Sequence, residues 1–239
     1  MKTRLIKDKI PAKYLNWLVS ARLEFLNDML QGKPMRYFSA HLPVMATWRN
    51  HPSMSPLSKG GMEEGVFSDE NDLFPVNMTV KGLGLIPKEE SLKHYIDVFG
   101  GVIAEARTMP WAESLHKRVE AMIRLYGTIE NLDPTMLGGI EIFEGRTFEN
   151  LRENPYASLL YMGMKHTQGG MEYISFQVNG KVEILEKENL YYKFLLASRK
   201  LFEFDKFHLY QPNYPFGYLI KVLEVRDKSP WSRIQKDSS

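Results

Sequence analysis

The segment that most constrains the fold of this chain runs from Gly138 to Gly163 and reads GGIEIFEGRTFENLRENPYASLLYMG. An apolar alternation predicts a strand that ends at Gly145, a residue that permits a tight turn. One short helical turn is expected over 148–153, and Asn154-Pro155 ends it because the residue before a proline disfavours the helical backbone. The apolar run 157–161 then predicts a buried strand.

Arg146 and Thr147 lie between the predicted strand and this short helix. A helix start offers unpaired backbone N–H groups and the positive end of the helix dipole, which favour an anion such as a phosphate. An equally ordinary interpretation is a strand–turn–strand connection in which Thr147 caps the helical turn and Arg146 is a solvated charge. The spacing alone leaves both interpretations open.

The run FEGRTFENLRENPYASLLY resembles a segment of the FMN-binding split β-barrel proteins, which include flavin reductase-like and pyridoxamine 5'-phosphate oxidase-like proteins. In that segment a Thr or Ser, an Asn-Leu and an Asn-Pro precede an apolar strand, and it holds the phosphate of FMN. The resemblance implies that the forked guanidinium of Arg146 binds the phosphate and that Thr147 contributes a hydroxyl. It also implies that the N–H groups of Phe148 and Glu149 complete the cradle, while Asn150 ties the turn.

A second resemblance lies over 41–57, which reads as a β-hairpin. The predicted strands are 44–48 and 53–57, joined by the turn-forming Arg49-Asn50-His51-Pro52. In the split-barrel families the returning strand of such a hairpin lies along the flavin ring. The resemblance therefore implies that Ser53, Met54 and Ser55 lie near the isoalloxazine. The alternative is a surface hairpin that binds no ligand.

The chain is expected to form a single split-barrel domain over 1–239, preceded by an N-terminal helical part over 1–35. The range 58–136 departs from the usual barrel pattern and is predicted to be a helical insertion, whose VNMTVKGLGL run is either a strand or an extended cover. Helical periodicity predicts helices over 12–31, 88–107 and 110–126.

The C-terminal part reads as a strand, a turn, a strand, a helix and a last strand. Asn179-Gly180 is a strong hairpin signal, and it separates the predicted strands 171–178 and 181–185. A helix over 188–204 and a final strand over 218–225 follow.

The tail after the final strand is polar, apart from Trp231. Split-barrel flavoproteins often carry an aromatic or basic residue there, near the cofactor. The resemblance thus makes Trp231 and Arg233 candidate cofactor contacts, although a tryptophan that anchors the chain end is an alternative.

Composition excludes several kinds of chemistry. The chain of 239 residues has no cysteine, so disulfides, thiolate nucleophiles and thiolate metal sites are excluded. Its formal charge of +2 gives no indication of nucleic-acid binding. No local metal motif, phosphate-binding glycine loop or nucleophile elbow is present. No signal peptide or apolar stretch of membrane-spanning length is found, which favours a cytoplasmic protein.

We therefore expect an α+β protein, an antiparallel Greek-key-like split β-barrel with added helices. The resemblance implies that it binds FMN, forms a homodimer and acts as an oxidoreductase or flavin reductase, with a nicotinamide as a possible electron donor. A flavin supplies the redox chemistry itself, so few catalytic side chains are required and none is assigned. Two alternatives remain: a haem-binding or haem-degrading protein of the same fold, with His51, His166 and His208 as candidate ligands, and a non-catalytic ligand-binding or structural protein.

Overall fold

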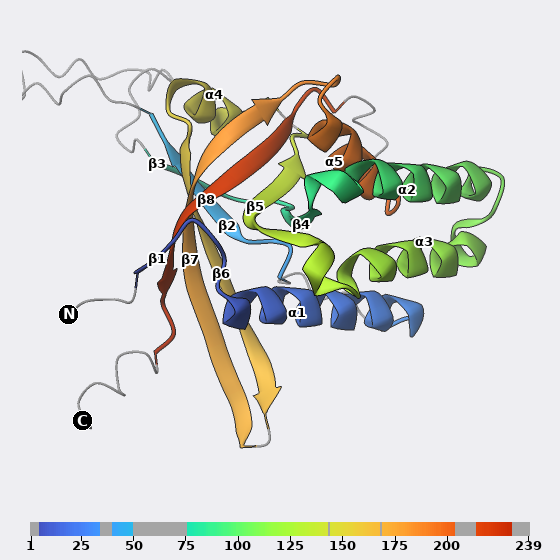
Figure 1. Cartoon of the computed structure of the whole chain (residues 1–239), viewed down its shortest axis with the longest axis horizontal. Helices are drawn as coiled ribbons and strands as arrows, with labels where there is room; N and C mark the ends of the chain where they lie inside the picture. Colours follow the sequence, from blue (N-terminus) through green and yellow to red (C-terminus); the bar gives the residue numbers. More distant parts are fainter. Residues whose placement is uncertain are drawn as a thin grey trace, which may run out of the picture.

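The sheet of this protein joins strands that lie far apart in the sequence. The computed structural model describes residues 5–33, 40–49, 76–142, 144–167, 169–203 and 214–230, without the side chains of 5–7 and His166. Its eight strands form one antiparallel sheet in the order β3-β2-β6-β7-β8-β5-β4, with β1 paired to β8 (Figure 1). The strands are β1 Leu5–Lys7, β2 Val44–Trp48, β3 Val76–Val80, β4 Gly84–Pro87, β5 Leu132–Ile140, β6 Tyr156–Thr167, β7 Gly170–Leu185 and β8 Gly217–Asp227.

The two ends of this sheet are joined by a very short connection. β3 and β4 stand at opposite ends of the strand order, yet only residues 81–83 separate them in the chain. A residue spans at most about 3.6 Å, so the sheet must curl until its two edges approach each other. Gly82 lies directly against β5, because a Cβ added at Gly139 would fall 2.2 Å from the Gly82 carbonyl oxygen. The sheet is therefore a β-barrel that is split between β3 and β4.

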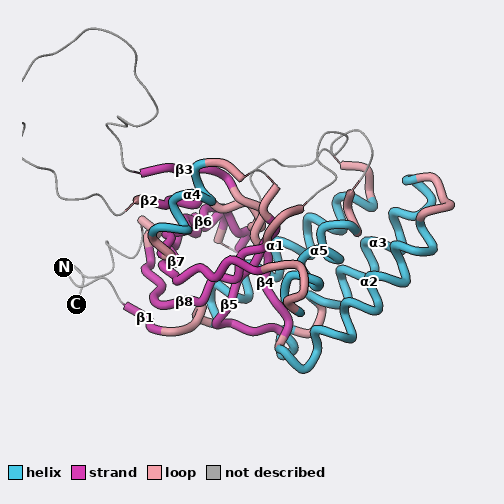
Figure 2. The backbone as a smooth tube through the Cα atoms, turned by 90° about the horizontal axis from the view of Figure 1, so that it is seen from above, coloured by secondary structure: helices cyan, strands magenta, loops and turns pink. Residues whose placement is uncertain are grey.

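Four of the described helices form a layer beside the barrel, and the fifth, α4, lies apart from them, near β2 and β3 (Figure 2). α1 packs on α3, α3 on α2 and α2 on α5, in a row along one side of the sheet (Figures 1 and 2). α4 packs against β2 and β3. The helices are α1 Ala12–Leu30, α2 Leu92–Ala106, α3 Trp111–Tyr126, α4 Arg146–Glu153 and α5 Leu190–Lys200, with short 3₁₀ turns at Glu89–Ser91 and Ile129–Asn131.

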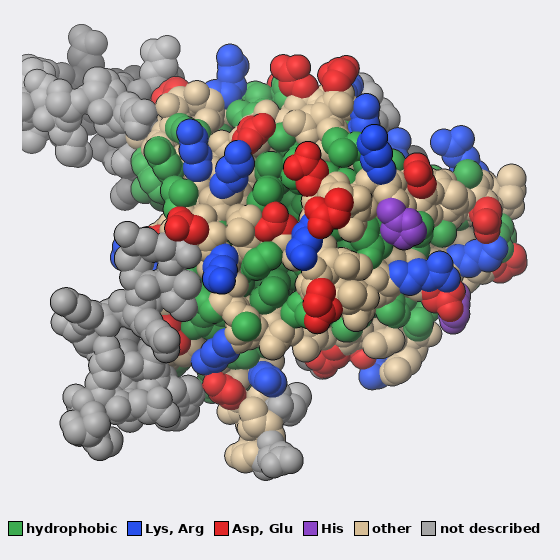
Figure 3. Space-filling view, in the orientation of Figure 1, with side chains coloured by type: hydrophobic (Ala, Val, Ile, Leu, Met, Phe, Trp, Pro, Cys, Tyr) green, Lys and Arg blue, Asp and Glu red, His purple; other side chains and the backbone are tan. Residues whose placement is uncertain are grey.

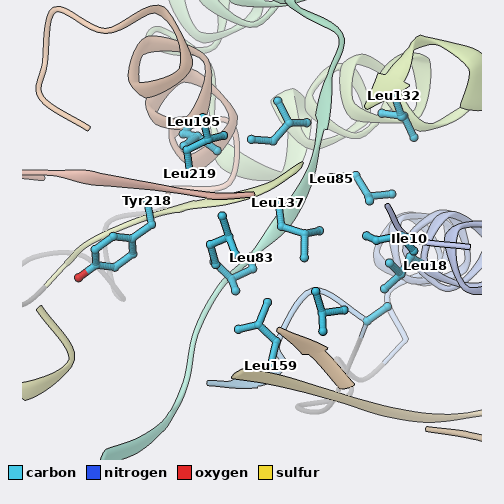
Figure 4. Packing of buried hydrophobic residues seen from close by; sticks show 14 of the residues in the cluster. Ile10, Leu18, Leu83, Leu85, Leu132, Leu137, Leu159, Leu195, Tyr218 and Leu219 are labelled. Atoms are coloured by element: carbon cyan, nitrogen blue, oxygen red, sulfur yellow. The ribbon is translucent and has the colours of Figure 1, made fainter. Parts of the chain in front are cut away.

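The core lies between the sheet and these helices. Apolar side chains from strands and helices converge on it, among them Leu137 and Leu219 of the sheet, Leu18 of α1 and Leu195 of α5 (Figure 4). α1 contributes Tyr14, whose ring stacks on Phe176 of β7 with centroids 4.2 Å apart. The N-terminal helix is thus an integral part of the core.

The helices lie where the periodicity predicts them, but the predicted hairpin over 171–185 is wrong, and β2 pairs with a strand that was not expected to be its partner. The range 171–185 is one continuous strand, β7, and Asn179-Gly180 forms a register shift against β8 instead of a turn. β6 pairs along its whole length with residues 170–181 of β7, and Gly180 allows a close approach to β8, since a Cβ there would fall 2.6 Å from Ile220 Cγ2.

The other correction concerns β2. Its hairpin partner is β3, with Val44 opposite Val80, whereas the predicted partner 53–57 lies outside the described residues. The range 58–136 is therefore only partly a helical insertion. It contains α2 and α3 as predicted, but it also supplies β3, β4 and the first half of β5 to the sheet.

Candidate functional site

The turn that leads into α4 matches the sequence prediction closely. β5 ends at Ile140, Gly145 is the N-cap of α4 with an extended backbone, and α4 ends at the extended Asn154 before Pro155. Arg146, the first helical residue, is partly exposed, and Thr147 is buried. The chain thus brings a cation and a hydroxyl together at a helix start, as required for anion recognition.

A hydrogen-bonded network fixes the buried face of α4 to β2 and β3. Asn77 Nδ2 donates to Thr147 Oγ1 at 2.9 Å, and Asn150 Nδ2 donates to Thr47 Oγ1 at 3.2 Å. Thr47 and Asn77 are directly opposed in the β2–β3 ladder. Within the described chain, Thr147 Oγ1 accepts but does not donate, so its proton remains available for a ligand oxygen.

Arg49 ties the end of β2 to the exposed side of α4. Its Nη2 lies 2.7 Å from Glu149 Oε2, and its Nε donates to Asn150 Oδ1 at 3.2 Å. The sequence analysis placed Arg49 in a turn and did not consider Thr47 or Asn77. For both Thr47 and Asn77, the sequence shows only a polar residue within an apolar strand. The β2–β3 register is needed to show that both side chains face α4.

The backbone groups of the predicted cradle are already engaged. The N–H groups of Phe148 and Glu149 both donate to the Gly145 carbonyl oxygen, at 2.9 and 3.2 Å. The Phe148 ring is buried and stacks on Phe216 with centroids 4.8 Å apart. The arrangement therefore fits phosphate recognition through the Arg146 and Thr147 side chains, and it does not fit a cradle built from these two amides.

Several predicted site residues cannot be placed. Ser53, Met54, Ser55, Trp231 and Arg233 lie outside the described residues. The same holds for two of the three candidate haem ligands, His51 and His208; His166 lies in β6, but its side chain is not described. In the part of the chain that the structure describes, no group of three or more His, Asp or Glu side chains is arranged to hold a metal ion.

A buried charged cluster lies beneath the connection from β3 to β4. Glu141 has no exposed surface, and its two carboxylate oxygens lie 3.1 and 2.8 Å from Lys81 Nζ. The Tyr218 hydroxyl also donates to Glu141, and burial together with this carboxylate raises the pKa of Tyr218. Through this cluster, residues 81–83, which close the barrel, are tied to the end of β5 and to β8.

A groove of about 560 Å³ lies between α1 and the β6–β7 hairpin, which projects past α1 (Figure 1). Its volume is in the range of ligand pockets, and its walls include Trp17, Phe25, Met162 and Tyr173. Met162 lies six residues along β6 from Tyr156, a distance of about 20 Å at the usual strand rise. The groove is therefore remote from the start of α4.

The outer face of the sheet carries apolar side chains around a polar centre. Two adjacent rows of cross-strand neighbours run over β3, β2, β6, β7 and β8, in that order. The first row is Met78, Ala46, Ser158, Asn179 and Glu224. The second row is Val80, Val44, Leu160, Gln177 and Arg226. Ser158, Gln177 and Asn179 are hydrogen bonded to one another. Met78 is 66% exposed and Met162 is 56% exposed, on either side of this centre. An apolar area of this kind is typical of an interaction surface.

Two general features concern the surface charge and the helices. Charged side chains of both signs are interspersed over the face shown in Figure 3, without a large area of one sign. None of the helices that the structure describes is both long enough and apolar enough to cross a membrane.

Comparison with known proteins gave no match to any family model or to any curated protein sequence. Among solved structures, the chain is similar to an FMN-binding protein from Syntrophomonas wolfei subsp. wolfei (10% identity, 91% of this chain and 92% of that chain, TM-score 0.39). It is also similar to a putative pyridoxamine 5'-phosphate oxidase from Lactobacillus delbrueckii (13%, 94% and 98%, 0.40) and to HupZ of Group A Streptococcus (12%, 87% and 94%, 0.35). With its sheet closed by residues 81–83, the chain has the α+β architecture of an antiparallel split β-barrel with added helices.

Proposed function

We propose that this protein binds FMN, with the phosphate at the start of α4, and acts as a flavin-dependent oxidoreductase or flavin reductase. The observation that carries the proposal is the pairing of Arg146 and Thr147 at the first turn of α4. Arg146 is partly exposed and can reach a ligand, and the Thr147 hydroxyl keeps its proton for an acceptor. A bound flavin would supply the redox chemistry, and the protein would hold and orient it.

The residues around this turn would position the two phosphate ligands. Asn77 fixes the Thr147 hydroxyl from β3, and Asn150 fixes the second turn of α4 through Thr47 of β2. Arg49 balances the charge of Glu149, which would otherwise oppose a phosphate at the helix start. Each side chain therefore has a binding or positioning role that does not require it to react.

We also propose that two copies of the chain associate through the outer face of the sheet. Ser158, Gln177 and Asn179 at the centre are already hydrogen bonded to one another, which lowers the cost of covering them. The exposed apolar side chains of β3 and of the β6–β7 hairpin flank this centre and would gain from burial. Association would also let each copy contribute side chains to the flavin bound by the other.

The proposal is tested by an absorption spectrum of the purified protein, followed by denaturation and identification of the released chromophore. Flavin bands and released FMN are the expected result. Reduction of the bound flavin by NADPH or NADH, measured at 450 nm under anaerobic conditions, then tests the nicotinamide donor. A haem band in place of the flavin would overturn the choice of cofactor. A colourless protein that takes up no added FMN would support the non-catalytic alternative.

A further inference from the structure

A small cavity of about 10 Å³ lies where α1, the end of α3, β4, β5 and β6 meet. It is lined by Arg22 from α1, Tyr126 from α3, Tyr161 from β6 and His41 from the chain before β2, with apolar side chains around them. A cavity of this size admits a single small ligand, so phosphate, sulfate and organic anions do not fit.

Two polar atoms of the cavity lining lack a hydrogen-bond partner. Arg22 Nε and the Tyr161 hydroxyl are both buried, and neither is bonded to any of the described residues. Arg22 as a whole residue is partly exposed, but its Nε atom is buried and is not accessible to solvent. Both atoms are donors, because a guanidinium N–H cannot accept and burial keeps the Tyr161 phenol protonated by raising its pKa. The residues that line the cavity thus include two buried donors that are not satisfied by the described residues.

The charge of Arg22 is not balanced by a carboxylate within the described residues. Its guanidinium lies 5.4, 5.8 and 5.9 Å from the ring centroids of Phe25, Tyr126 and Phe202, and it is bonded to the Tyr126 hydroxyl. His41 is neutral, because burial and the nearby Arg22 lower its pKa well below the usual value, and a neutral imidazole cannot balance the charge of Arg22. A desolvated cation without a counter-charge is unfavourable, and a bound anion removes that penalty.

We propose that this cavity binds one small monovalent anion, a halide such as chloride, between Arg22 Nε and the Tyr161 hydroxyl. A water molecule has a suitable size and also accepts two hydrogen bonds, but it leaves the Arg22 charge unbalanced. The anion would tie α1 and α3 of the helical layer to β6 of the barrel. The residues that line the cavity are different from those of the proposed flavin site at the start of α4.

The experiment compares thermal unfolding in sodium chloride, sodium bromide and sodium gluconate at equal ionic strength and pH 8. We expect the midpoint temperature of the wild-type protein to rise with chloride or bromide concentration and to level off, with no such rise in gluconate. Tyr161→Phe and Arg22→Met should each abolish the difference between salts. Tyr156→Phe, an exposed tyrosine of the same strand, should retain it.

A crystal soaked in bromide gives a second measurement that needs no variant. A single anomalous peak beside Arg22 Nε is expected. Equal midpoint temperatures in all three salts together with no anomalous peak would overturn the proposal and leave a water molecule in the cavity. A halide effect that persists in Tyr161→Phe would also overturn it, because the halide would then act elsewhere on the protein.

Discussion

Lys81 Nζ lies 2.8 Å from Oε2 of Glu141, a carboxylate with no exposed surface, and this ion pair fixes the connection that closes the barrel. Lys81→Met removes the Lys81 ammonium and leaves the buried Glu141 carboxylate without this counter-charge. We expect the free energy of unfolding to fall by about 3–5 kcal/mol in urea denaturation. The matched control is Lys221→Met, whose exposed pair with Glu183 at 3.6 Å should cost less than about 1 kcal/mol. Equal losses in the two variants would contradict this role for Lys81.

His41 makes the stability of the fold depend on pH. Burial, and then the charge of Arg22, lower its pKa in the folded protein, so the folded state stays neutral while the unfolded chain binds a proton below about pH 6.5. The unfolded state then holds more protons, and stability must decrease as the pH falls below that value. Where His41 is protonated in the unfolded state and neutral in the folded state, it lowers the free energy of unfolding by about 1.4 kcal/mol for each unit that the pH falls.

The measurement is urea denaturation at pH 7.5, 6.5, 5.5 and 5.0 for wild-type protein and His41→Gln. The variant should lose less stability over this range. His116→Gln serves as the control, since His116 is exposed on α3 beside Glu120, and it should follow the wild-type curve. Parallel curves for wild type and His41→Gln would show that this imidazole does not resist protonation.

Gly163 and Gly100 should respond to alanine with opposite signs. A Cβ at Gly163 would fall 2.4 Å from Cζ2 of Trp17, whose buried ring packs edge-on against Phe176. Gly163→Ala should therefore destabilise the protein by about 1–3 kcal/mol. Gly100 lies in α2 with nothing within 4 Å of an added Cβ, so Gly100→Ala should stabilise it by about 0.5–1 kcal/mol. The measurement is the thermal denaturation midpoint of each variant compared with the wild-type protein. A higher midpoint for Gly163→Ala would contradict the prediction, because Trp17 would then make room for the added methyl group without a loss of stability.

Met78→Glu tests the proposed association through the outer sheet face. The substitution puts a charge on the most exposed apolar side chain of β3, so we expect at least about a tenfold weaker dimer in sedimentation velocity. Leu30→Glu changes an exposed apolar residue at the end of α1, away from this face, and should leave association unchanged. Association that is equally strong in both variants would exclude the outer face as the interface.

Arg146→Ala tests the phosphate assignment. Loss of a charge-assisted hydrogen bond should weaken FMN binding by about 1.5–3 kcal/mol, measured by quenching of flavin fluorescence. Arg152→Ala removes an equal charge from the last turn of the same helix, where the guanidinium lies 6.0 Å from the Phe148 ring, and affinity should not change. If Arg146→Ala binds FMN as tightly as Arg152→Ala does, the phosphate lies elsewhere.

Local signals in the sequence predicted the helices and the turn before α4 correctly. α1 ends at a glycine in the left-handed region, Gly32 with φ 64°, and α4 ends at Asn154 before Pro155, and both boundaries depend only on neighbouring residues. The helix in 146–153 was expected to begin at Phe148, and it begins at Arg146 because Gly145 is its N-cap.

Pairing between distant strands was not predictable in the same way. Asn179-Gly180 is a strong turn signal by itself, yet an unbroken ladder with β6 on one side and pairing with β8 on the other, shifted in register at this point, keep the chain extended there. β2 pairs with β3 across the long range that includes 51–75, so no short-range pattern identifies the pair. The contact from Asn77 to Thr147, and with it the positioning of the candidate phosphate ligand, follows from that register and was missed for the same reason.

The closure of the sheet by residues 81–83 also determines the order in which the protein can fold during synthesis. β2 is made early, but its inner neighbour β6 begins only at Tyr156, and β1 pairs with β8, the last strand of the chain. Pairing over such long sequence separations is slow, because the entropy of closing large loops is lost before the contacts form. A ribosome-bound chain therefore holds β2 without β6 until residues 156–167 have been made, and it holds β1 without β8 until residues 217–227 have been made.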